Sequence, residues 1–201
     1  MLTFLDVSKW QESINWQLVA DHQIEGQYIR GAIARATVAD QTIDPMLRAN
    51  LDGIQATGRL WPGAYHNLIN DSVTAQVGRF VAAIPDWKGI IPMVDCEQGA
   101  TWVQLHHFIN LIEVELGVRP LVYLPRWYWE GMQGAEPLPP EWTWVHSDFP
   151  PWGTPLIPPL TSLEGHVWQY TSSGVVPGIN ARVDLNRYYG NEEVLLRLAV
   201  Q

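Results

Sequence analysis

A regular alternation of short β-rich runs with amphipathic segments constrains the fold of this chain more than any other feature. The β-rich runs are separated by stretches whose apolar residues recur every three to four positions. We expect strands at residues 3–8, 28–35, 60–66, 90–97 and 119–124. This β-α-β order favours a parallel sheet, because each helix carries the chain back across a face of the sheet.

The segments between these strands carry helix start and stop signals. The expected helices run from Asp44 to Gly58, from Asp71 to Pro85 and from Thr101 to Gly117, with a weaker one over residues 16–23. The third has the clearest signal, because Thr101 and Gln104 form a capping box and Gly117 follows the last apolar residue.

The second half of the chain shows few helices. Residues 137–159 hold eight of the 15 prolines, and proline disrupts the helix interior, so we expect rigid loops flanking one strand. The later elements are expected as strands at 142–146, 166–170 and 182–185 and a helix at 192–199. A full eightfold barrel needs about 250 residues. The sequence therefore predicts a truncated TIM-like β/α barrel, with eight strands, helices mainly in the first half, and residues 1–201 forming a single domain.

Charge and cysteine content exclude several classes of protein. Twelve Lys and Arg against 21 Asp and Glu give a net charge of −9, which disfavours nucleic-acid and membrane partners. We expect a monomer. The single cysteine, Cys96, cannot form an intramolecular disulfide, and no nucleotide-binding or metal-binding motif occurs, so we expect no cofactor and no metal. The start MLTFLDVS lacks the pattern of a signal peptide, and no apolar run is long enough to span a membrane.

The expected strand ends are unusually polar. In parallel barrels the reactive side chains lie at the carboxyl ends of the strands. In chain order these ends carry Asp6, Arg35, Tyr65 with His66, Asp95 with Glu97, Tyr123, His146 with Asp148, Gln169 and Asp184. Four strand ends therefore bring carboxyl groups to one mouth of the barrel.

Asp95 and Glu97 give the sharpest local signal. Residues two apart on a strand face the same side, with Cα atoms roughly 6.5 to 7 Å apart. Two such carboxyls do not both ionise easily, so one keeps a proton and the pair offers an acid and a base. A D-x-E tripeptide is also common at solvated strand ends. Cys96 between them points to the opposite face and is interpreted as a small buried hydrophobe.

Aromatic residues and histidines give weaker signals. Six aromatic side chains lie at or just past the strand ends: Trp10, Tyr65, Tyr123, Trp127, Trp129 and Trp168. They suit either stacking on sugar rings or ordinary packing at the barrel rim. His66 either contacts substrate or supports a residue that does, while His106 and His107 are expected at the surface.

Taken in order, the motifs make the chain resemble the glycoside hydrolase family 25 lysozymes, also called Chalaropsis-type muramidases. They are FLDVSKWQ with Asn15-Trp16, ARAT, DPMLRANLDGIQATG, PGAYH, MVDCE, RPLVYLPRWYW, WQYTSSGVVPGI and VDLNRY. The resemblance covers nearly the whole chain. It implies a helix-poor β/α barrel that hydrolyses the β-1,4 bond between N-acetylmuramic acid and N-acetylglucosamine in the glycan strands of bacterial peptidoglycan.

The resemblance also implies roles for individual residues. Glu97 is the expected general acid and base, Asp95 the carboxylate that orients and polarises substrate, and Asp6 and Asp184 complete the acidic floor. Residues expected to bind substrate are Tyr65, Tyr123, Arg35, Trp127, Trp168, Gln169 and His66. The expected chemistry is retention of configuration, in which the acetamido oxygen of the substrate attacks the anomeric carbon.

Two departures from the family pattern affect the expected specificity. Val38 stands where the family usually has an acidic residue shortly after ARAT, and WVHSDF replaces the usual sixth strand, which places His146 and Asp148 in the region of the groove. Two rival functions remain open, a cell-wall binding module that has lost turnover and a family 18 chitinase, although the DxxDxDxE signature of the latter is absent. The expected setting is a phage endolysin released from the host cytoplasm, or a secreted enzyme with its signal removed.

Overall fold

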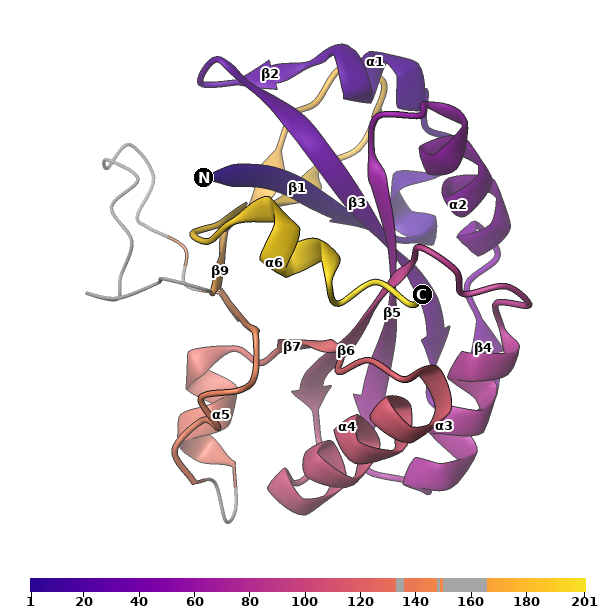
Figure 1. The fold of residues 1–201 in the computed structure, drawn as a ribbon, viewed down its shortest axis with the longest axis vertical. Coiled ribbons are helices and arrows are strands. Elements are labelled where there is room, and N and C mark those ends of the chain that lie inside the picture. Colours follow the sequence, from indigo (N-terminus) through magenta and orange to yellow (C-terminus); the bar gives the residue numbers. More distant parts are fainter. Residues whose placement is uncertain (133–135, 148, 150–165) are drawn as a thin grey trace.

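Eight strands close into a barrel in the computed structural model, which describes residues 1–132, 136–147, 149 and 166–201 (Figure 1). The barrel strands are β1 (Leu2–Val7), β3 (Gln27–Val38), β5 (Trp61–Ile69), β6 (Ile91–Gln98), β7 (Leu121–Tyr123), β8 (Trp144–Ser147), β9 (Val167–Gly174) and β10 (Val183–Tyr188). Strand β1 pairs with both β3 and β10, which closes the ring. The two-residue strands β2 (Gln23–Ile24) and β4 (Thr42–Ile43) pair with β3 outside this ring. The predicted truncated barrel is confirmed.

The last strand runs against its neighbours. Strands β1, β3, β5, β6, β7, β8 and β9 pair in parallel, as the β-α-β order predicts, whereas β10 is antiparallel to both β9 and β1. A short connection without a helix joins β9 to β10, and such connections join antiparallel neighbours. Asp184 therefore lies near the amino end of its strand, which corrects the expectation of a carboxyl end. It still reaches the mouth, because it pairs in register with Asp6.

Helices cover mainly the first half of the barrel. They are α1 (Trp16–Asp21), α2 (Leu47–Ala56), α3 (Val73–Ala82), α4 (Trp102–Leu116), α5 (Arg126–Gly131) and α6 (Glu192–Leu196), with a 3-10 turn η1 (Lys9–Gln11) after β1. The capping box of α4 is present, and Gly117 ends that helix with φ of 73°, a left-handed conformation that favours glycine.

Two helix predictions differ from the structure. Helix α2 begins at Leu47, later than predicted, because residues 45–46 form a turn ahead of it. The Asp44 carboxylate accepts hydrogen bonds from Arg35 and from the Lys9 and Met46 backbones. Helix α5 was not predicted. It is six residues long, and its run of aromatic residues shows no apolar face of helical period.

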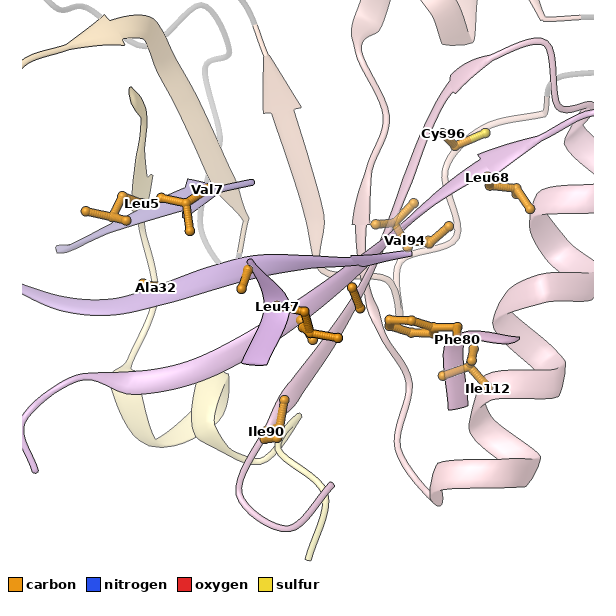
Figure 2. Packing of buried hydrophobic residues seen from close by; sticks show 14 of the residues in the cluster. Leu5, Val7, Ala32, Leu47, Leu68, Phe80, Ile90, Val94, Cys96 and Ile112 are labelled. Atoms are coloured by element: carbon orange, nitrogen blue, oxygen red, sulfur yellow. The ribbon is translucent and has the colours of Figure 1, made fainter. Parts of the chain in front are cut away.

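The strands separate two apolar layers. Outward side chains such as Val94 and Cys96 pack against helix residues that include Phe80 and Ile112 (Figure 2). The inward side chains that fill the barrel are Phe4, Ile33, Trp61, Tyr65, Ile91, Met93, Leu121, Val145, Val167 and Tyr188. Leu195 of α6 and Ala199 just beyond it belong to the same inner cluster, so the C-terminal segment closes the end of the barrel opposite the strand ends. The inward positions beyond these apolar side chains, at the mouth of the barrel, can therefore be occupied by polar side chains.

The proline-rich stretch is described only in part. Strand β8 lies inside it, as predicted, whereas residues 150–159 lie outside the described residues. Among the helices that the structure describes, none has the length and apolar character needed to cross a membrane.

Candidate active site

A groove of about 340 Å³ opens at the mouth of the barrel. Four carboxyl groups line it: Asp6, Asp95, Glu97 and Asp184. Arg35, Tyr65, Tyr123 and Gln169 line the same groove. The structure thus brings together eight of the residues that the sequence placed at the site, and they come from β1, β3, β5, β6, β7, β9 and β10.

Strand β6 supplies the central carboxyl pair. Ile91 and Met93 point into the barrel, so its two-residue period also turns Asp95 and Glu97 inward and Cys96 outward. Cys96 is buried, and burial together with the neighbouring carboxyls raises the pKa of its thiol above its usual range. A thiol in this environment is inert, as the sequence predicts.

Asp95 is the more buried member of this pair. Its Oδ2 accepts a hydrogen bond of 2.8 Å from the Asn67 side-chain amide. Its Oδ1 has no hydrogen-bond partner among the described residues. Burial, followed by the charge of Glu97, raises the pKa of Asp95 well above its usual value. The Asn67 N–H lowers this pKa, because it stabilises the ionised carboxylate.

Glu97 lies nearer the solvent than Asp95, at the end of β6 that reaches the mouth of the barrel. It is only partly buried, whereas Asp95 is 8% exposed. Burial and the charge of Asp6 raise the pKa of Glu97 above its usual value. Both shifts in the pair have the same sign, so the two carboxyls retain a proton to a higher pH than isolated side chains do.

The second carboxyl pair spans two strands. Asp6 Oδ2 accepts hydrogen bonds from Asn186 at 2.9 Å and from Gln169 at 3.1 Å. Asp184 has its pKa raised to about 8 by burial, by the charge on Asp6 and by a hydrogen bond to Asp6. Asp184 therefore holds its proton to a higher pH than a free side chain and donates to Asp6. Burial raises the pKa of Asp6 as well, while the hydrogen bonds from Asn186, Gln169 and Asp184 lower it.

The tyrosines and Arg35 complete the walls. The Tyr123 hydroxyl donates to Gln169 Oε1 at 3.3 Å, and Gln169 in turn donates to Asp6. Burial and the charges of Asp6 and Asp95 raise the pKa of Tyr65 well above 10, so its hydroxyl stays a donor. Arg35 donates to the buried Asp44 carboxylate at 2.8 Å, which fixes the guanidinium at the edge of the groove and balances its charge.

Two predicted substrate-binding residues lie on the wrong face of their strands. His66 is fully buried in the outer layer, stacked on Phe108 with ring centroids 4.9 Å apart and hydrogen bonded to Thr37 and Gln76. Burial lowers the pKa of His66 to about 4, so it is neutral. Trp168 is also fully buried and belongs to the outer core cluster. Successive strand residues point to opposite faces, so in both cases an error of one position reverses the predicted face.

The unusual sixth-strand sequence WVHSDF does not bring His146 to the groove, contrary to the expectation. His146 is fully buried, with its ring centroid 4.7 Å from that of Trp144 on the outer face of β8, so it does not line the groove. Asp148 lies outside the described residues. Val38 lies at the end of β3, and it is not among the residues that form the described wall of the groove.

The remaining aromatic residues and histidines divide between the groove and the core. Trp10 is 68% exposed and lines the groove. Trp127 is 64% exposed but lines a separate cavity, and Trp129 packs against Trp144. His107 is exposed as expected, whereas His106 is half-buried and packs between Trp102 and Trp142.

Sequence reasoning missed the two asparagines that bind the carboxylates. Asn67 follows Tyr65 by two residues on β5, and Asn186 follows Asp184 by two on β10. The two-residue period of a strand was the signal that could have found both, because each shares a face with a residue already placed in the groove.

No group of three or more His, Cys, Asp or Glu residues in the described part of the chain is arranged to hold a metal ion. The groove offers carboxyl, amide and hydroxyl groups. Two neighbouring carboxyl groups with raised pKa values in an open groove at the strand ends suit the acid and base that a glycoside hydrolase built on a barrel requires.

Comparison with known proteins identifies the family. The family profile described as "Glycosyl hydrolases family 25" matches residues 5–179, and the chain belongs to that family. Among curated proteins, lysozyme M1 of Streptomyces globisporus is 26% identical over 97% of this chain and 70% of its own length. The uncharacterized protein YegX of Escherichia coli O157:H7 is 28% identical over 95% of this chain and 71% of its own.

Solved structures share the fold. A family GH25 lysozyme from Aspergillus fumigatus superposes with a TM-score of 0.78 at 18% identity, covering 100% of this chain and 99% of that one. A family 25 glycosyl hydrolase from Bacillus anthracis gives a TM-score of 0.77 at 23% identity, covering 98% and 93%. The catalytic domain of endolysin ply40 from Listeria monocytogenes bacteriophage P40 gives 0.74 at 20% identity, covering 98% and 97%.

Proposed function

We propose that this glycoside hydrolase is a muramidase, which cleaves the β-1,4 bond between N-acetylmuramic acid and N-acetylglucosamine in bacterial peptidoglycan. The observation that carries the proposal is the open groove that Asp95 and Glu97 enter from one strand, with Asp6 and Asp184 beside them. Family membership and the named activity of lysozyme M1 support the choice of substrate.

Glu97 is proposed as the general acid. It is only partly buried at the end of β6, and burial raises its pKa above the usual value, which favours the protonated form that a general acid needs. In the first step that proton goes to the glycosidic oxygen as the bond to the anomeric carbon breaks. In the second step the Glu97 carboxylate accepts a proton from the attacking water.

Asp95 is proposed to act on the substrate acetamido group. Its Oδ2 is held by Asn67, its buried Oδ1 has no partner within the described structure, and Asp95 is among the residues that line the groove. An acetamido N–H donating to the Asp95 carboxylate aligns the acetamido oxygen for attack on the anomeric carbon. The positive charge that develops on this ring favours ionised Asp95 and offsets the effect of burial on its pKa.

This route gives retention of configuration by substrate assistance. The acetamido oxygen displaces the leaving sugar, and water then displaces the acetamido oxygen, so two inversions leave the β configuration. Proton NMR of the first-formed product is expected to show the β anomer. An α anomer formed first would exclude this route.

Asp6 and Asp184 are proposed to hold substrate and set the charge of the groove. Asp184, whose pKa is raised to about 8, holds the proton of this pair and donates to Asp6. Arg35, Tyr65, Tyr123 and Gln169 are proposed to bind the glycan through their polar groups, with residues 1–201 acting as one monomeric catalytic domain.

The bond that is cleaved can be identified from the products. Digested peptidoglycan is reduced with borohydride and analysed by mass spectrometry, and the proposal predicts that muramic acid residues carry the new reducing ends. Reduced glucosamine ends, or the absence of new ends, would refute it. The proposed place of action is the bacterial cell wall, reached by release from phage-infected cytoplasm or by secretion with the signal removed.

A further inference from the structure

A second cavity, of about 480 Å³, lies beside the groove. Asn70, Gly99, Thr101, Trp127, Tyr128 and Met132 are among its lining residues. Gln98 lines the groove and the next residue, Gly99, lines the second cavity. The two cavities are therefore neighbours at the end of β6. The second cavity is therefore placed to contact a substrate that extends out of the groove.

The wall of this cavity is held rigidly around an exposed indole. Trp127 is 64% exposed, although tryptophan normally buries most of its surface. Its ring meets that of Tyr128 edge-on, with centroids 5.6 Å apart. The Tyr128 hydroxyl donates to the Ala100 carbonyl at 2.8 Å, which ties α5 to the segment between β6 and α4. The indole is thus presented to solvent by a fixed support.

The chemistry of the cavity is the opposite of that of the groove. The described residues that line it carry no charged side chain, but they offer an amide, hydroxyls, an indole and the thioether of Met132. An N-acetylated pyranose is neutral, has an apolar ring face that stacks on indole, and carries hydroxyls and an acetamido group. Peptide stems of peptidoglycan carry several charges, and these are poorly matched by a neutral cavity.

The position of Trp127 in the barrel supports an extended glycan. Trp10 follows β1 and Trp127 follows β7, and three strands separate β1 from β7 in either direction around the closed ring. The two exposed indoles therefore flank opposite sides of the mouth, with the carboxyl groups between them. A glycan that passes over the carboxyls from the side of Trp10 leaves the groove toward Trp127.

We propose that the second cavity is an outer subsite, in which Trp127 stacks on one N-acetylhexosamine residue of the glycan chain, away from the bond that is cleaved. This inference rests on the proposed glycan-cleaving function. Trp127 acts there as a binding residue whose contribution depends on chain length.

The test uses the Glu97→Gln variant, in which the acid is removed and substrate persists. Chitotetraose, a neutral β-1,4 tetramer of N-acetylglucosamine, is titrated while the indole N–H signals are followed by NMR. The signal that disappears in a Trp127→Phe derivative assigns Trp127. The proposal predicts that this signal shifts on titration, and an unmoved signal overturns it.

Affinity gives a second readout. Trp127→Ala is expected to weaken chitotetraose binding by about three- to tenfold, the effect of losing one stacked ring, whereas Trp127→Phe keeps most of the affinity. Tyr28→Ala is the control, because Tyr28 is an exposed aromatic at the opposite end of the barrel. Equal affinity of Trp127→Ala and Tyr28→Ala overturns the subsite.

A disaccharide muropeptide that keeps its peptide stem tests the alternative ligand, which is the stem peptide. A Trp127 shift with the muropeptide but not with chitotetraose would assign the cavity to the stem peptide and overturn the sugar subsite. Release of reducing-end muramic acid by the unmodified protein is scored separately. If that release fails while Trp127 still responds to chitotetraose, the muramidase proposal falls and the sugar subsite stands.

Discussion

The groove contains two pairs of carboxyl groups that differ in what surrounds them. Asp6 and Asp184 face each other across β1 and β10 and share a hydrogen bond, and Asp6 also accepts hydrogen bonds from Asn186 and Gln169. Asp95 and Glu97 follow each other on β6, with one amide donor for Asp95 and partial exposure for Glu97. We propose that Asp6 and Asp184, the saturated pair, set the charge of the groove, and that Asp95 and Glu97, the reactive pair, act on the substrate.

Replacement of Glu97 is expected to have the largest effect. Glu97→Gln keeps the size of the side chain but removes the transferable proton, so turnover of peptidoglycan should fall by about 10²- to 10⁴-fold. Steady-state rates of reducing-end release measure this loss. An aryl glycoside substrate whose leaving group needs no proton serves as the control, and it should be much less affected. Near wild-type turnover of peptidoglycan would reassign the acid.

Asn67→Ala tests the support of the reactive pair. The Asn67 N–H lowers the pKa of Asp95, so its loss raises that pKa. If ionised Asp95 is required, the acidic limb of the kcat/KM profile moves to higher pH, and the rate at low pH falls by about tenfold, the value of one hydrogen bond to a charged group. Asn67→Asp is a poor comparison because it adds a charge. An unmoved acidic limb would show that Asn67 does not act through Asp95.

Asp184→Asn tests the saturated pair. Asp184 is protonated below its pKa of about 8, and an asparagine amide also donates to Asp6. Turnover well below that pH should therefore fall less than about tenfold. Above it, ionised Asp184 adds a negative charge to the groove of the unmodified protein, so the variant should keep activity further into the alkaline range. A loss as large as that of Glu97→Gln would contradict this division.

The same substitution affects stability with a defined sign. The pKa of Asp184 in the folded protein exceeds the value of 3.8 for a free side chain, so the folded state binds more protons between those two values. The contribution of Asp184 to stability therefore falls as pH rises from about 4 to about 8. Asp184→Asn should raise the Tm relative to the unmodified protein more at pH 8 than at pH 4, measured by thermal unfolding. An equal difference at both values would count against the raised pKa.

His66→Ala is expected to have the smallest effect on catalysis. His66 lies in the outer layer, so kcat/KM should stay within about twofold. Its loss removes the hydrogen bond to the buried Thr37 hydroxyl and one of the hydrogen bonds of Gln76, which lowers the free energy of unfolding by about 1 to 3 kcal/mol. Kinetics and urea unfolding on one preparation separate the effect on catalysis from the effect on stability. A large loss of kcat/KM in a stably folded variant would return His66 to the site.

The fold was largely predictable because its signals are local. The capping box of Thr101 and Gln104 and the two-residue period of β6 each depend on a few neighbouring residues. The antiparallel direction of β10 and the pairing of Asp6 with Asp184 depend on contacts between the two ends of the chain, which no local pattern contains. His66 and Trp168 were assigned to the wrong face because successive strand residues point to opposite faces. An error of one position therefore reverses the predicted face.

The central claim is that Asp95 and Glu97 form the reactive pair while Asp6 and Asp184 hold charge and substrate. The most direct test measures kcat of Glu97→Gln and Asp184→Asn on the same peptidoglycan, at a pH well below the Asp184 pKa of about 8. We predict that Glu97→Gln is at least about 10-fold slower than Asp184→Asn, since general-acid catalysis exceeds the value of a retained hydrogen bond. Equal rates for the two variants would contradict the account.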